Sequence, residues 1–91
     1  MGILDFVRSK PKEPTLQERA ESFIARHGGD DFLRSVAHNV DPYMDLSPEY
    51  RGLTRTAQEM VGGDLCGTYG GVLETVMRRR LVQMGVLREV A

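Results

Sequence analysis

Apolar residues recur at helical spacing in four segments of the chain, and the first of these spans residues 15–27. One face of this segment carries Leu16, Ala20, Phe23, Ile24 and His27. Thr15 and Glu18 have the spacing of a capping box, in which each side chain accepts a hydrogen bond from the other residue's backbone N–H. Gly28 and Gly29 supply the left-handed conformation that commonly ends a helix. We therefore expect a helix that begins after Thr15 and ends before Gly28.

The second segment predicts a helix capped by Asp30 or Asp31 and ended by Pro42. Its apolar face consists of Phe32, Leu33, Val36, Ala37 and Val40. Residues 41–47 follow as an irregular connection. We expect the apolar side chains of this connection to fold over the core: Tyr43, Met44 and Leu46.

A third helix is predicted to begin at Ser47, where a capping hydroxyl precedes Pro48 at the first helical position and Glu49 in the first turn. Gly62 and Gly63 end it. Its apolar face consists of Tyr50, Leu53, Ala57, Met60 and Val61.

The segment from residue 62 to residue 84 allows two structures. Five glycines between positions 62 and 71 favour a loop, which would open a shorter helix near Val72. An unbroken apolar stripe at helical spacing favours one long helix over residues 64–84, and it consists of Leu65, Tyr69, Val72, Leu73, Val76, Met77 and Leu81. In the register of this long helix Gly63, Gly67 and Gly71 stand four residues apart on one side, where small residues let a second helix approach closely. We prefer the long helix and expect these three glycines to mediate self-association.

These patterns predict an all-α protein, a small bundle of about four helices with an extended N-terminal arm. Residues 1–14 form the arm and linker, because Pro11 and Pro14 disfavour a helix there. Residues 15–91 form a single helical domain, since a chain of 91 residues is long enough for one core only. The polar and apolar alternation of a strand has one candidate, in residues 86–90.

The residues able to carry chemistry form no catalytic or metal-binding pattern. Cys66 is the single cysteine, so an internal disulfide is impossible and a cysteine-based zinc site lacks ligands. A nucleophilic role would require Cys66 to meet His27 or His38, which the spacing does not predict. The stretch from Gly62 to Thr68 has the glycine gap of a phosphate-binding loop but lacks its lysine. We therefore expect a protein that is not an enzyme and that uses no cofactor or metal.

Charge is unevenly distributed, although the formal net charge is only -1. Residues 30–49 carry five acidic side chains against one arginine, or -4, and residues 75–91 carry four arginines against one glutamate, or +3. We expect these segments to form surfaces of opposite charge. Because arginine makes forked contacts with carboxylate or phosphate, the candidate partner-binding residues are Arg78, Arg79, Arg80, Asp41, Asp45 and Glu49. We expect Arg80 to pair with an acidic side chain of residues 41–49, within the chain or across a dimer.

The sequence favours a small non-catalytic interaction or regulatory protein, of accessory or inhibitor type, that binds a protein partner. Because so short a chain buries a modest core, we also expect a homo-oligomer. The alternative is a nucleic-acid-binding regulator that uses the Arg78–Arg80 patch, despite the negative net charge. No run approaches the roughly 18 apolar residues that a membrane span needs, so we expect no span and a cytoplasmic location.

Overall fold

The computed structural model describes residues 14–41, 43 and 47–88. Within these ranges the chain forms four α-helices, one short 3₁₀-helix and no strand: α2 (Leu16–Arg26), α3 (Asp30–Asn39), η1 (Pro48–Tyr50), α4 (Gly52–Val61) and α5 (Gly67–Gln83). The predicted all-α bundle is therefore confirmed. Residues 1–13 of the predicted N-terminal arm lie outside the described residues, and the division at residue 14 stays a prediction.

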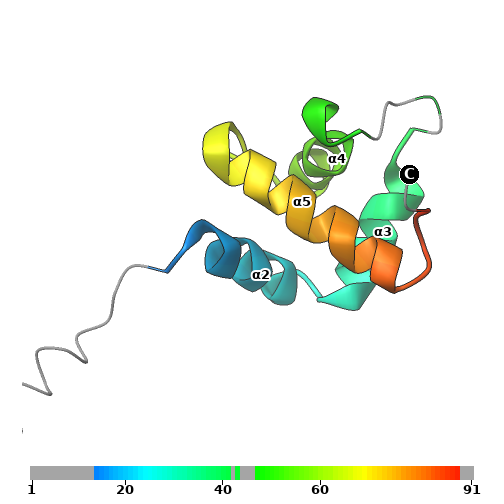
Figure 1. Ribbon diagram of the computed structural model, residues 1–91, viewed down its shortest axis with the longest axis horizontal. Helices are drawn as coiled ribbons and strands as arrows, with labels where there is room; N and C mark the ends of the chain where they lie inside the picture. The colour runs from blue at the N-terminus through cyan, green and yellow to red at the C-terminus, as the bar shows by residue number, and fades with distance from the viewer. Residues whose placement is uncertain (1–13, 42, 44–46, 89–91) are drawn as a thin grey trace, which may run out of the picture.

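The long helix α5 lies at the centre of the bundle and packs against α2, α3, α4 and η1 (Figure 1). α2 runs beside α5 in the same direction. Near the start of both helices the Arg19 guanidinium lies 4.8 Å from the centre of the Tyr69 ring. Beyond the other end of α2, Arg80 Nη2 lies 3.0 Å from Asp30 Oδ1.

The core is formed by apolar side chains from all four α-helices and the segment before α5. Its buried members are Ala20, Phe23, Ile24, Phe32, Leu33, Val36, Leu53, Ala57, Leu65, Leu73, Val76, Met77 and Leu81. Phe23 and Phe32 meet edge to face, with ring centres 5.8 Å apart. The exposed His27 ring covers this end of the core, 4.7 Å from the Phe23 ring.

Both ends of α2 form as their local sequence predicts. The Glu18 N–H donates to Thr15 Oγ1 at 3.1 Å, and the Thr15 N–H donates to Glu18 Oε1 at 2.9 Å. The second of these bonds is the main reason that the pKa of Glu18 lies below its usual value. At the other end the Gly29 N–H donates to the Ile24 carbonyl at 2.8 Å. The predicted capping box and glycine stop are both confirmed.

Two expectations for the second segment are wrong. The residue that caps α3 is Gly29, and no side chain caps it, because Asp30 and Asp31 already lie in the first helical turn. Their carboxylates still suit the positive end of the helix dipole. Tyr43 does not cover the core, since its side chain is 95% exposed. Met44 and Leu46 lie outside the described residues.

The third predicted helix is interrupted at Arg51. This residue adopts the left-handed conformation, with φ 52° and ψ 42°, and separates η1 from α4. Tyr50 therefore leaves the helical register of α4 and is exposed. Met60 and Val61, in the last turn of α4, also lie at the surface, so the predicted apolar face is only partly buried.

The glycine-rich segment combines the two predicted structures. Residues 62–66 are not helical, whereas residues 67–71 form the first turns of α5. Asp64 shapes the turn before the helix, because its Oδ1 accepts hydrogen bonds from the Cys66 thiol at 2.7 Å and the Cys66 N–H at 3.4 Å. Gly63 has φ 97° and precedes the helix, so the expectation that Gly63, Gly67 and Gly71 share one helical face is wrong.

Candidate binding groove

A buried carboxyl group holds α4 against α5. Glu74 is fully buried, and its two oxygens accept hydrogen bonds from the Thr54 N–H at 2.8 Å and the Leu53 N–H at 3.4 Å. α4 has no side-chain cap of its own, so Glu74 satisfies the free donors of its first turn from the neighbouring helix. The Thr54 hydroxyl adds a 3.2 Å bond to the Gly70 carbonyl.

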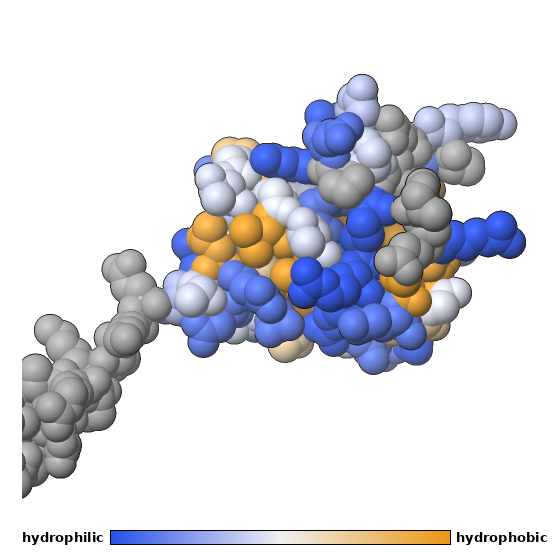
Figure 2. Space-filling view, in the orientation of Figure 1, coloured by the Kyte–Doolittle hydropathy of each residue, from blue (hydrophilic) through white to orange (hydrophobic). Residues whose placement is uncertain are grey.

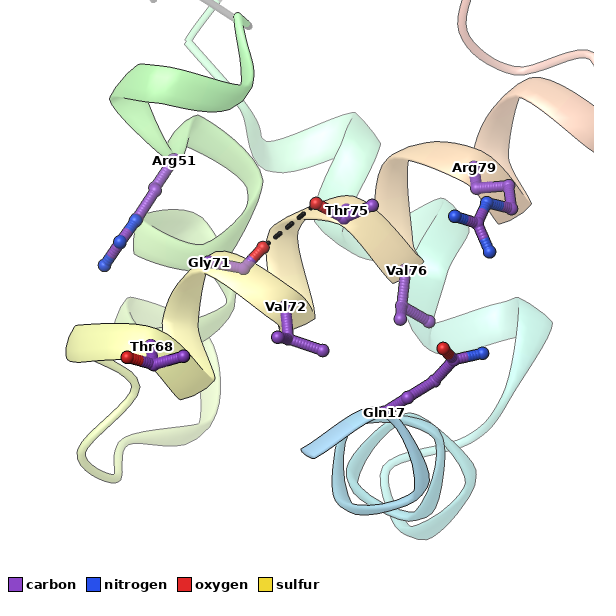
Figure 3. Close-up of a pocket in the computed structure, with 8 residues that line it drawn as sticks. All are labelled: Gln17, Arg51, Thr68, Gly71, Val72, Thr75, Val76 and Arg79. Carbon is purple, nitrogen blue, oxygen red and sulfur yellow. Dashed lines mark hydrogen bonds between the residues drawn. The ribbon is translucent and has the colours of Figure 1, made fainter. Parts of the chain in front are cut away.

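Gly70 lets the segment before α5 approach the helix closely. A Cβ atom at this position would overlap the carbonyl oxygen of Leu65. It would also lie 3.3 Å from Nη1 of Arg51, and a Cβ on Gly71 would lie 3.3 Å from Nη2 of the same side chain. The left-handed residue Arg51 therefore lays its guanidinium along the first turns of α5, as Figure 3 shows.

An open groove of about 510 Å³ runs along the exposed side of α5. Its lining comes from α2, from the residue before α4, and from α5: Gln17, Arg51, Thr68, Gly71, Val72, Thr75, Val76 and Arg79 (Figure 3). Arg51 and Arg79 lie toward opposite ends, with Val72 and Val76 between them. Figure 2 shows hydrophobic atoms bordered by hydrophilic ones over the region where α2 and α5 lie side by side.

The groove lining is positively charged and uncompensated. Its described residues include two arginines and no acidic side chain. Neither the Arg51 guanidinium nor the Arg79 guanidinium makes a hydrogen bond or ion pair with another described residue, and the same holds for the side chains of Gln17 and Thr68. The Thr75 hydroxyl, by contrast, donates to the Gly71 carbonyl at 3.1 Å. The groove thus offers two cations, and two polar groups without a partner among the described residues, around an apolar floor.

The three consecutive arginines point to three different environments. Arg79 lines the groove. Arg78 is half-buried, and its Nε and Nη2 are enclosed without a hydrogen-bond partner. Arg80 pairs with Asp30, and no pairing with residues 41–49 is found among the described residues. Arg80 reaches Asp30 because the short turn after α2 brings the start of α3 to the last turns of α5. Pairing of Arg80 across a dimer stays a prediction.

Of the predicted acidic candidates, Asp41 and Glu49 do not line the groove. Asp41 is exposed and accepts the Tyr43 N–H at 2.8 Å, and Glu49 is exposed in η1. Asp45 lies outside the described residues. Because Asp30 pairs with Arg80, the acidic and basic segments meet at this contact.

The predicted self-association glycines have different environments. Gly63 lies in the turn before α5, Gly67 is the first residue of the helix, and Gly71 lines the groove against Arg51. Their role in self-association stays a prediction.

The structure does not bring Cys66 together with a histidine. The thiol is exposed and donates to Asp64, which raises the pKa of Cys66 and lowers the pKa of Asp64. A raised pKa leaves little thiolate near neutral pH, and the thiolate is the nucleophile. His27 lies at the end of α2, whereas Cys66 precedes the start of α5, at the opposite end of the parallel helix pair (Figure 1).

Comparisons with protein-family models, with curated proteins and with solved structures found no match for this chain. Within the ranges that the structure describes, no helix has the length and hydropathy needed to cross a membrane. The same part of the chain holds no cluster of three or more His, Cys, Asp or Glu side chains placed to bind a metal ion.

Sequence reasoning singled out Arg79 and Gly71 but did not bring them together with Arg51 and Gln17 in one groove. Arg51 and Gln17 reach it from other elements, and no local pattern reports such a contact. A usable signal was the polar side of the α5 stripe, since Thr68, Thr75 and Arg79 recur at intervals of seven and four residues. A second was Glu74 within an apolar stripe, where an acidic residue needs a buried partner.

Proposed function

We propose that this domain is a non-catalytic module that binds a partner protein in the groove between α2 and α5. The observation that carries the proposal is the position of Arg51 and Arg79 on either side of the apolar floor, with guanidinium groups that have no partner among the described residues. Arginine beside exposed apolar surface is typical of protein-binding sites. A regulatory or accessory role in the cytoplasm, and self-association of the domain, belong to the same proposal.

No observation favours the nucleic-acid alternative. Binding to a phosphate backbone relies on several cations that face it together. Here Arg80 is paired with Asp30, Arg78 is half-buried, and only Arg79 of the three lines the groove.

The proposal is tested by affinity capture from the native host, with mass spectrometry and then calorimetry on the purified partner. Arg79→Glu reverses a charge within the groove, and Arg34→Glu makes the same charge change on α3, whose residues do not line the groove. We expect wild type and Arg34→Glu to retain the same partner and Arg79→Glu to lose it. Circular dichroism must show equal helicity for all three proteins. Retention of every captured partner by Arg79→Glu would show that the groove is not the binding site.

A further inference from the structure

We infer that the groove binds an extended acidic segment of the partner, in which two carboxylates four positions apart flank an aliphatic side chain. This inference rests on the proposed function and specifies the chemistry of the partner. It follows from the charge of the lining, from the separation of the two arginines and from the character of the floor between them.

The spacing of the two carboxylates follows from the positions of Arg51 and Arg79 along α5. The Arg51 guanidinium lies against Gly71, and Arg79 lies eight residues further along the same helix. Eight residues at 1.5 Å each place the Cα atom of Arg79 about 12 Å beyond that of Gly71 along the helix axis. Four residues of an extended chain span about 13 Å, so carboxylates at positions i and i+4 of a bound segment reach both arginines.

The floor specifies the residue between the two acids. In an extended chain the side chains of positions i, i+2 and i+4 lie on the same face. When the two acids face Arg51 and Arg79, the side chain at i+2 therefore faces the floor. Val72 is half-buried and Val76 is 5% exposed there, which suits a small aliphatic side chain.

The edges of the groove suit a peptide backbone. The Gln17 amide and the Thr68 hydroxyl lie on α2 and on the first turn of α5, and neither makes a hydrogen bond with a described residue. Both groups donate and accept, as the N–H and carbonyl groups of an extended segment require. A nucleic acid strand carries one negative charge per nucleotide and no aliphatic side chain, and so matches neither the two separated cations nor the floor.

The N-terminal arm is the competing occupant within the chain, because its last residue, Pro14, lies three residues before Gln17. Its apolar cluster, residues 3–7, contains one acid, Asp5, and is followed by three cations: Arg8, Lys10 and Lys12. Two carboxylates four positions apart do not occur in it, so its charge does not match the groove.

The test is fluorescence polarisation of labelled peptides with the full chain at low and moderate salt. The core Glu-Ala-Val-Ala-Glu presents both acids and the valine on one face. Gln-Ala-Val-Ala-Gln removes the charges, and Ala-Glu-Val-Glu-Ala keeps the composition but turns the acids away from the valine face. We expect each altered peptide to bind about tenfold weaker or worse than the first, and the first to weaken as salt rises.

Protein variants locate the binding. Arg51→Gly removes one guanidinium and suits the left-handed backbone at φ 52°, so it should stay folded. Both Arg51→Gly and Arg79→Glu should lower the affinity for the Glu-Ala-Val-Ala-Glu peptide about tenfold, and Arg34→Glu should leave this affinity unchanged.

Several outcomes would overturn the inference. They are equal binding of the acidic and neutral peptides, tighter Arg79-dependent binding of a single-stranded oligonucleotide, and tighter Arg79-dependent binding of a peptide of residues 1–13. If the captured partner depends on Arg79 while no acidic peptide binds, the proposed function stands and this inference fails. If acidic peptides bind in the groove but Arg79→Glu still captures the partner, the inferred peptide preference of the groove stands and the proposed function fails.

Discussion

Replacing Glu74 with methionine tests the buried contact that joins α4 to α5. Methionine keeps an unbranched side chain of similar length but removes both oxygens that accept from Thr54 and Leu53. A buried donor left without an acceptor costs about 1–3 kcal/mol. The 2.8 Å bond to Thr54 should carry most of this cost, because the 3.4 Å bond to Leu53 is long. Since methionine is also easier to bury than a carboxyl group, we expect a net loss of about 2 kcal/mol.

Glu74→Gln provides the graded comparison. Its single carbonyl oxygen can keep the short bond to Thr54, so we expect a loss of about 1 kcal/mol. Glu59→Met is the matched control, because Glu59 is exposed on α4 and its loss should change stability by less than about 0.5 kcal/mol. Urea unfolding followed by circular dichroism measures all three against wild type. A Glu74→Met protein as stable as wild type would show that the two hydrogen bonds do not stabilise the fold.

Two further predictions concern the segment that leads into α5. Gly70→Ala should destabilise the protein by about 2 kcal/mol or more, because the new Cβ overlaps the Leu65 carbonyl oxygen, whereas Gly71→Ala should be neutral or stabilising through helix propensity of about 1 kcal/mol. Thermal unfolding compares them, and equal melting temperatures would contradict the close approach at Gly70. Asp64→Asn removes the charged acceptor that raises the pKa of Cys66, so more thiolate forms and iodoacetamide should alkylate Cys66 several-fold faster at pH 8. An unchanged alkylation rate would show that the Asp64 contact does not control the thiol.

Features determined by neighbouring residues could be predicted from the sequence. The capping box of Thr15 and Glu18 lies within one helical turn, and the glycine stop after α2 depends on two adjacent residues. Apolar periodicity identified the four helical segments for the same reason. It was wrong at Met60 and Val61 because burial at the end of α4 depends on what packs there, not on spacing.

Features determined by distant residues could not be predicted. The carboxyl group that caps the start of α4 comes from Glu74, twenty residues beyond Thr54. The close approach of the Leu65 carbonyl to α5 requires a glycine at position 70. Regular spacing along the sequence instead selected Gly63, Gly67 and Gly71. That spacing had meaning only in a helix that began before Gly63, and the Asp64 turn makes α5 begin later.

The groove and the core meet around Gly70, and this shared position determines which substitutions can change binding without changing stability. Gly70 is approached by the Leu65 carbonyl, the Thr54 hydroxyl and the Arg51 guanidinium. A substitution that moves the start of α5 therefore moves one cation of the groove as well, and it should lower both stability and affinity. Arg79 is exposed and without a partner among the described residues, so its charge can be reversed without disturbing the contacts around Gly70. Loss of binding in Arg79→Glu at unchanged stability is consequently stronger support for the groove than any loss caused by substitutions around Gly70.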